Sequence, residues 1–224
     1  EYSHLIDGKR VGLITNHTGV NSKLERTVDV LYRYNGANLT SIYSPEHGLD
    51  GKAVAGAYVD SYTDTTLNLP VYSLYGKTRK PSPQMLSNVD VLIFDMQDIG
   101  SRTYTYMSTL NYAMIAAKEN GKTIVVLDRP NPVGGLNVEG YVLEDKYKTF
   151  VGVDNMPMAH GMTAGELALF FNRNIGADVK IVPMKNYSRN MIWQDTGLPF
   201  VQTSPNIPNI ESAFAYMATG IGDG

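Results

Sequence analysis

Short apolar runs alternate along the chain with longer stretches in which apolar residues recur every three or four positions. The runs are rich in Val, Ile and Leu and are bounded by polar residues or glycine, which is typical of buried strands. They lie at residues 10–15, 39–43, 71–74, 89–94, 123–127 and 179–182. Near-continuous apolar strands separated by amphipathic helices predict an α/β protein, with a mostly parallel sheet covered by helices on both faces.

Three stretches between these runs predict helices. The spacing S-K-L-E at residues 22–25 fits a capping box and begins a helix that Gly36 ends. A longer helix is expected over residues 105–119. A second capping box, T-A-G-E at residues 163–166, precedes another apolar stretch. Because this cap fully explains Glu166, we do not count it among the candidates for chemistry.

Polar turns follow four of the predicted strands. They carry Asn16 and His17; Glu46 and His47; Asp95, Gln97, Asp98 and Arg102; and Asp128, Arg129 and Asn131. In an open parallel sheet the ligand crevice lies outside the carboxyl ends of the strands, so we expect these turns to converge on one edge. The polar loop at residues 50–66 is long enough to cover a site there.

The turn S-P-E-H-G at residues 44–48 is the most distinctive of these. Proline cannot donate to a sheet ladder and glycine admits backbone angles closed to other residues, so Glu46 and His47 are expected on a sharp turn. Such a turn is a rigid mount for a reactive carboxylate. The alternative is that Glu46 is a solvated loop charge and His47 a turn residue that bonds its own backbone.

Composition narrows the classes of partner and cofactor. The net charge is -3 without a Lys/Arg cluster, which argues against nucleic acid or an anionic membrane surface, and no apolar run is long enough to span a membrane. The absence of cysteine excludes disulfides and thiolate chemistry. The nucleotide-binding motifs G-x-G-x-x-G and G-x-x-x-x-G-K-[ST] are absent, so a dinucleotide or P-loop phosphate site is not supported. The G-x-S-x-G elbow of serine hydrolases with this type of sheet is also absent. We therefore expect a Rossmann-like fold without a cofactor.

A metal site is a separate hypothesis. His47, Asp98 and His160 have the right chemistry for metal ligands, but they do not form a local pair such as H-x-x-x-H. We therefore assign no metal ligand from the sequence, and a metal-dependent hydrolase stays an alternative.

Five motifs, in order and covering nearly the whole chain, also carry a family resemblance. They are S-P-E-H-G, D-M-Q-D-I-G-S-R-x-Y-T-Y, D-R-P-N-P, A-H-G-M-T-x-G-E-L-A, and D-T-G-L-P-F with S-P-N-I-P. Together they resemble the bacterial exo-β-N-acetylmuramidase family, glycoside hydrolases, usually exported, that remove N-acetylmuramic acid from non-reducing ends of peptidoglycan glycans. The resemblance implies a Rossmann-like domain, a smaller C-terminal domain, a site between them, and peptidoglycan-derived saccharides as partners.

The resemblance makes Glu46 the catalytic carboxylate, and a carboxyl beside His47 in a closed crevice could be tuned to donate a proton. Asp98 is expected to be the second carboxylate. Arg102 is expected to bind the lactyl carboxylate that distinguishes muramic acid from glucosamine, because a guanidinium matches a carboxylate in two parallel bonds. The alternative for Arg102 is an ion pair with Asp98 or Asp128.

Further substrate-binding candidates come from the same motifs: Asn16, Tyr104, Tyr106, Arg129, Asn131, His160 and Asn206. The two tyrosines could present surfaces to a sugar, with one of them packed in the core. His160 either faces the crevice or bonds to the backbone near a helix start. The alternative for Arg129, Asn131 and Asn206 is that they hold their turns by bonding backbone carbonyls.

The two ends of the chain suggest its organisation. It begins at Glu1 without a methionine, and it stops in a glycine-rich turn after an apolar, helix-like stretch. We therefore expect a removed signal segment and a periplasmic or secreted location. Residues 1–184 are expected to form the Rossmann-like domain, and residues 185–224 to begin a connecting segment or second subdomain, with the smaller C-terminal domain largely absent. A glycan-binding module without catalysis is the remaining alternative, and the oligomeric state is open.

Overall fold

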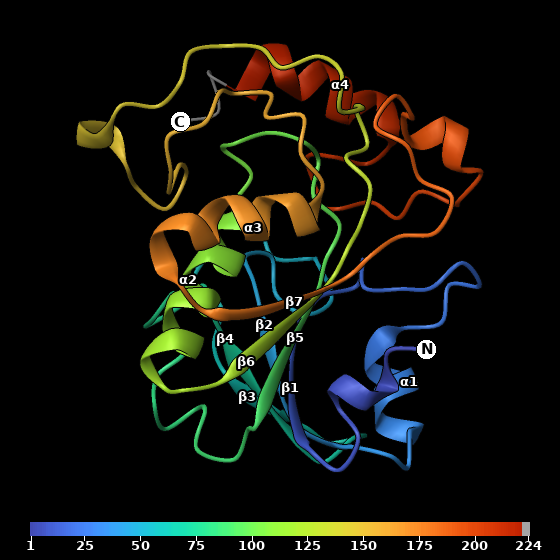
Figure 1. The fold of residues 1–224 in the computed structure, drawn as a ribbon, viewed down its shortest axis with the longest axis vertical. Coiled ribbons are helices and arrows are strands. Elements are labelled where there is room, and N and C mark those ends of the chain that lie inside the picture. The colour runs from blue at the N-terminus through green and yellow to red at the C-terminus, as the bar shows by residue number, and fades with distance from the viewer. Residues whose placement is uncertain (221–224) are drawn as a thin grey trace.

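A sheet of seven strands forms the centre of the structure, a computed structural model that describes residues 1–220 (Figure 1). The strands are β1 (Arg10–Thr15), β2 (Asn38–Ser44), β3 (Tyr62–Asp64), β4 (Leu69–Ser73), β5 (Val91–Asp95), β6 (Thr123–Leu127) and β7 (Asp178–Val182). Their order is β3-β4-β2-β1-β5-β6-β7, and every neighbouring pair except β3 and β4 is parallel. The predicted α/β class and mostly parallel sheet are therefore confirmed.

Helices cover both faces of this sheet. They are α1 (Thr27–Arg33), α2 (Tyr106–Glu119), α3 (Ala164–Ile175) and α4 (Ile210–Thr219), and short 3-10 helices cover Ser3–Leu5, Asp145–Tyr147 and Trp193–Thr196. In Figure 1, α2 and α3 lie together on one side of the sheet and α1 lies on the other. Helix α4 crosses the end of the molecule at which the site described below is found.

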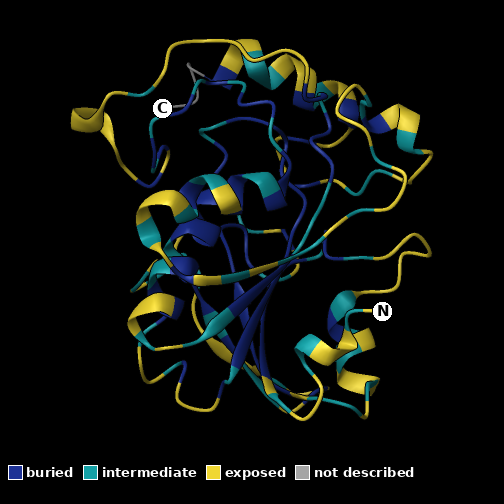
Figure 2. Cartoon of the chain, in the orientation of Figure 1, coloured by how far each residue is buried: buried dark blue, intermediate teal, exposed yellow. Residues whose placement is uncertain are grey.

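Alternate residues of the central strands feed two separate cores. Ile14 and Phe94 pack in the core that contains α2 and α3. Leu13 and Ile93, their neighbours along the chain, pack in the core that contains Val28 of α1. Because both faces are buried, these strands are apolar throughout rather than alternating. Figure 2 shows the central strands buried and the outer faces of the helices exposed.

Helix α1 begins at Thr27, so the capping box predicted at residues 22–25 is wrong. The side-chain oxygen of Asn21 accepts a hydrogen bond from the backbone N–H of Glu25 at 3.0 Å, and Leu24 adopts a left-handed φ of 61°. These interactions close a turn, because an Asn side chain can satisfy nearby backbone groups without a helix.

The second capping box, before α3, is confirmed. The Thr163 hydroxyl accepts from the backbone N–H of Glu166 at 3.2 Å, and the Glu166 carboxylate accepts from the backbone N–H of Thr163 at 3.0 Å. The loop expected at residues 50–66 contains the edge strand β3, which the sequence pattern did not reveal because only three residues pair with β4.

The segment after residue 184 joins the same core as the sheet. Trp193, Ile207, Ile210 and Ala213 are buried with residues of α2 and α3. The domain boundary expected after this residue stays a prediction. Among the helices of residues 1–220, none has both the length and the apolar character needed to cross a membrane.

Candidate active site

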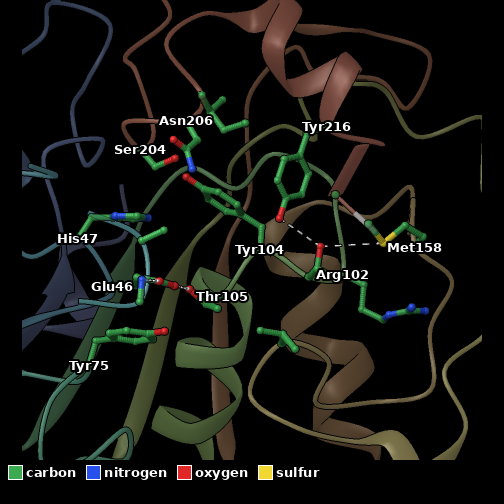
Figure 3. Close-up of a pocket in the computed structure, with 16 residues that line it drawn as sticks. Glu46, His47, Tyr75, Arg102, Tyr104, Thr105, Met158, Ser204, Asn206 and Tyr216 are labelled. Carbon is green, nitrogen blue, oxygen red and sulfur yellow. Dashed lines mark hydrogen bonds between the residues drawn. The ribbon is translucent and has the colours of Figure 1, made fainter. Parts of the chain in front are cut away.

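A cavity of about 540 Å³ opens at the carboxyl ends of β2 and β4 (Figure 3). Segments far apart in the sequence build its walls: the turn after β2, the chain after β4, the segment that leads from β5 into α2, residues 151–158, and the C-terminal segment with α4. Asn16, Glu46, Asp98 and Asn131 all follow the carboxyl ends of parallel strands, so the prediction that they share one edge of the sheet is confirmed. Only Glu46 of these four lines the cavity.

Glu46 is held by hydrogen bonds from two other segments. Its Oε2 accepts from the hydroxyl of Thr105 at 2.5 Å, and its Oε1 accepts from the backbone N–H of Gly56 at 2.8 Å. Thr105 is the residue immediately before α2, and Gly56 belongs to the loop before β3. Glu46 is 8% exposed, and its carboxylate is held in a fixed position at the wall of the cavity.

His47 completes the sharp turn expected after β2. Its φ is 69°, Gly48 follows with a φ of 78°, and the N–H of Gly48 donates to the carbonyl of Pro45 at 3.1 Å. The His47 ring lines the cavity, and its Nδ1 lies 2.7 Å from the carbonyl of Ala53. Because a carbonyl only accepts, Nδ1 carries the proton and donates it to this bond.

Arg102 lines the cavity without a carboxylate partner among residues 1–220. Its Nη1 donates to the carbonyls of Tyr141 at 2.8 Å and Met156 at 2.6 Å, so neither alternative ion pair, with Asp98 or Asp128, forms. Burial lowers the pKa of the guanidinium, which nevertheless stays charged at neutral pH. A cation that is already fixed in position therefore borders the cavity.

The two tyrosines of the Y-T-Y segment take different places. Tyr104 lines the cavity, and its hydroxyl donates to the Thr203 hydroxyl at 3.0 Å. Tyr106 is fully buried behind it and donates to the Thr203 carbonyl at 2.6 Å. Burial raises the pKa of both phenols, so both stay protonated. Tyr104 can therefore meet a ligand, whereas Tyr106 is a core residue.

Asp98 and His160 lie outside the cavity and contact each other. The Nδ1 of His160 accepts from the backbone N–H of Met162 at 3.1 Å, so Nε2 carries the proton toward Asp98 Oδ2, 3.1 Å away. The same Asp98 oxygen accepts from the N–H of Gly100 at 2.8 Å. This local turn draws the Asp98 side chain inward. Asp98, expected to be the second carboxylate, therefore does not line the cavity, and His160 bonds to the backbone near the start of α3, the second of the two alternatives given for it.

Three other predicted binding residues are also placed outside the cavity. Asn16 accepts from the N–H and the hydroxyl of Thr18 at 2.9 and 2.6 Å. Arg129 pairs with Asp95 at 2.6 Å. The Oδ1 of Asn131 accepts from the N–H of Val133 in its own turn, and its Nδ2 donates to the carbonyl of Met162 in the segment before α3, at 3.2 Å each. Arg129 and Asn131 therefore hold backbone segments, as in the alternative given for them, and Asn16 holds its own turn, because buried polar groups are hydrogen-bonded.

Asn206 lines the cavity, in agreement with its selection from S-P-N-I-P. The sequence interpretation missed Thr105, Gly56 and Tyr75. Tyr75 directly follows the strand predicted at residues 71–74, and Thr105 lies at the start of the helix predicted after residues 89–94. Their proximity to Glu46 depends on the order of the strands in the sheet. Gly56 acts through its backbone N–H, which carries no residue-type signal.

No group of three or more His, Asp or Glu side chains close enough to hold a metal ion occurs in the part of the chain that the structure describes. The three candidates named from the sequence do not form such a group: His160 is bonded to Asp98, whereas His47 faces Ala53.

The fold and the cavity define an α/β protein with a carboxylate-lined cavity at the carboxyl edge of its sheet. The model of the family described as exo-β-N-acetylmuramidase NamZ, N-terminal, matches residues 11–211, and the chain belongs to this family. The resemblance drawn from the five motifs is thereby confirmed.

Individual relatives agree with this assignment. The chain is 54% identical over 226 residues to the peptidoglycan β-N-acetylmuramidase NamZ of Bacillus subtilis (strain 168), covering 100% of this chain and 55% of that protein. Two crystal structures of DUF1343 family proteins from Bacteroides fragilis NCTC 9343 are also similar. The first has a TM-score of 0.92 and is 48% identical, and the match covers 98% of this chain and 56% of that chain. The second has a TM-score of 0.84 and is 36% identical, and the match covers 100% of this chain and 59% of that chain. The chain thus spans about half the length of these relatives.

Proposed function

We propose that this chain carries the catalytic site of an exo-acting glycoside hydrolase that releases N-acetylmuramic acid from the non-reducing ends of peptidoglycan fragments. The observation that carries the proposal is Glu46, a carboxylate fixed by two hydrogen bonds at the wall of the cavity. The name of the Bacillus subtilis relative supports the substrate class. The cavity volume of about 540 Å³ falls within the range of small-ligand sites, roughly 300–1,000 Å³.

The chemistry needs a proton at the glycosidic oxygen as the bond from the anomeric carbon breaks. Glu46 is proposed as the general acid that supplies it. Most glycoside hydrolases place a second carboxylate across the sugar. Asp98 does not line the cavity, so we assign the second group to no residue of this chain.

Arg102 is proposed to recognise the lactyl carboxylate of muramic acid. Its guanidinium borders the cavity, two carbonyls fix its orientation, and no acidic side chain of residues 1–220 neutralises it. A charge-assisted bond to a substrate carboxylate would distinguish muramic acid from glucosamine, which lacks this group.

Arg102→Lys is therefore expected to reduce the preference for a muramic acid glycoside over its glucosamine analogue about 10-fold, because an ammonium keeps the charge but loses the planar pair of donors. The measurement is the ratio of kcat/KM on the two chromogenic glycosides. Arg173→Lys, which alters a pair with Asp154 outside the cavity, is the matched control. Equal losses on both glycosides, together with a lower melting temperature, would instead mean that Arg102 only holds the chain at Tyr141 and Met156.

The test of the function itself is incubation of the full-length protein with a chromogenic muramic acid glycoside. Release of the chromophore, with much less from the glucosamine analogue, is expected. Glycan binding without any sugar released would favour the binding-module alternative, and loss of activity with a chelator, restored by zinc or manganese, would favour a metal-dependent hydrolase.

We also propose that the protein works outside the cytoplasm, since its proposed substrate is a cell-wall fragment. Cell fractionation with an antibody against this chain tests the location. Recovery of the protein in the cytoplasmic fraction alone would contradict it.

A further inference from the structure

Strand register places Tyr75 beside Glu46. Strands β2 and β4 are parallel neighbours, Ser44 is paired with Ser73, and the N–H of Leu74 donates to the carbonyl of Ser44 at 2.8 Å. Glu46 and Tyr75 each come two residues after this last pair. Neighbouring strands lie about 4.8 Å apart, so two residues at equivalent positions leave the sheet side by side. Both side chains line the cavity, and Figure 3 shows the hydroxyl end of Tyr75 beside Glu46.

The hydroxyl end of Tyr75 faces this carboxylate (Figure 3). Burial, followed by the neighbouring charge of Glu46, raises the pKa of Tyr75 above its ordinary value. The phenol therefore stays protonated at neutral pH. A bond from a neutral donor to an ionised acceptor is about twice as strong as one between neutral groups.

Other contacts fix the Tyr75 ring before any ligand binds. The guanidinium of Arg79 lies 4.7 Å from the centroid of the Tyr75 ring and 4.7 Å from that of Phe150. The carbonyl of Tyr75 accepts from the N–H of Val59 at 3.1 Å. That valine belongs to the same loop as Gly56, which holds the other side of Glu46. The donor is thus preorganised, which is what makes a hydrogen bond effective against a charge that develops during reaction.

We infer that Tyr75 is a positioning residue for Glu46, and that its phenol donates a hydrogen bond that stabilises the carboxylate formed when Glu46 gives up its proton. The inference rests on the proposed function. In the hydrolysis step, the bond between the anomeric carbon and the glycosidic oxygen breaks, and its electron pair stays on the oxygen, which takes the proton from Glu46. A water molecule supplies the hydroxyl group that bonds to the anomeric carbon and releases its other proton to solvent, and Glu46 is left negatively charged. Tyr75 keeps its own proton and forms no covalent bond.

Tyr75→Phe removes only the hydroxyl, so it tests this role directly. We expect kcat on a natural muramic acid glycan to fall about 10- to 100-fold with KM little changed, because one hydrogen bond to a charged group is lost where charge appears. The loss should be smaller on a nitrophenyl glycoside, whose leaving group needs little protonation. Tyr72→Phe is the matched control: Tyr72 lies on β4, packs on Tyr43 at 5.5 Å between ring centroids, and is not among the residues that line the cavity.

The outcomes separate this inference from the proposed function. If the wild-type protein releases no sugar, the proposed function fails. If the wild type is active and Tyr75→Phe behaves like Tyr72→Phe on both substrates, the inference is overturned. A glycosyl group found covalently on Tyr75 by mass spectrometry, after reaction with a 2-fluoro sugar, would also overturn it, because the phenol would then be the nucleophile. Replacement by 3-fluorotyrosine, which keeps the hydroxyl, is expected to restore turnover lost in Tyr75→Phe.

Discussion

Glu46→Gln is expected to lower turnover of a natural muramic acid glycan by at least about 10²- to 10⁴-fold, the contribution of general acid-base catalysis. Glutamine keeps the shape of the side chain and can still bond Gly56 and Thr105, so the fold and ligand binding should survive. What is lost is the titratable proton. The measurements are kcat on the glycan, ligand affinity and melting temperature, each compared with the wild type.

Two controls sharpen this prediction. Glu119→Gln makes the same chemical change at a surface pair with Lys80, outside the cavity, and should leave turnover unchanged. A nitrophenyl glycoside should show a smaller loss in Glu46→Gln than the natural glycan does. If Glu46→Gln kept near-normal turnover and Asp98→Asn had none, Glu46 would not be the general acid, despite its position in the cavity.

Asp95→Ala is expected to destabilise the fold by about 3–5 kcal/mol, the cost of leaving a buried charge without its partner. Asp95 is 1% exposed, its Oδ1 accepts from Nε of Arg129 at 2.6 Å, and its other oxygen accepts from the hydroxyl of Thr27. The alanine would leave the Arg129 guanidinium, whose side chain is 16% exposed, without a counter-charge. Chemical denaturation gives the free energy of unfolding.

The surface provides a matched comparison. Arg10 and Asp90 form an ion pair of the same length, 2.6 Å, but their side chains are 45% and 38% exposed. Water screens such a pair, so Asp90→Ala should cost far less than Asp95→Ala. If Asp90→Ala and Asp95→Ala lowered the free energy of unfolding by similar amounts, burial would not be what makes the pair of Asp95 with Arg129 strong.

The strands could be predicted because burial on both faces leaves an uninterrupted apolar run. Val91 to Phe94 is an example, since its residues alternate between two different cores and none of them needs to be polar. The capping box at residues 163–166 was also readable, because its two bonds are local. The same spacing at residues 22–25 gave a wrong prediction of a helix start. The side chain of Asn21 there accepts from the backbone N–H of Glu25, a group that the predicted cap would have used.

The site could be predicted only in part, for a similar reason. Glu46 could be predicted from the proline and glycine of its turn, and Arg102 and Asn206 could be predicted from the motifs that contain them. The inward turn of Asp98 depends on the N–H of Gly100, which sequence spacing does not reveal. Tyr75 depends on β4 being the neighbour of β2, and hydrophobic pattern alone does not give the order of strands in a sheet.

The bond between the backbone N–H of Gly56 and Glu46 makes one amide a reporter of the carboxylate. Gly56 is exposed and a Cβ added to it would meet no neighbouring atom, so little other than this bond protects its hydrogen from solvent. Its isotope exchange rate should therefore follow the fraction of time that the side chain of Glu46 faces the loop. The NMR resonance of the Gly56 amide would therefore report the orientation of the Glu46 side chain, the proposed acid, with no substrate present.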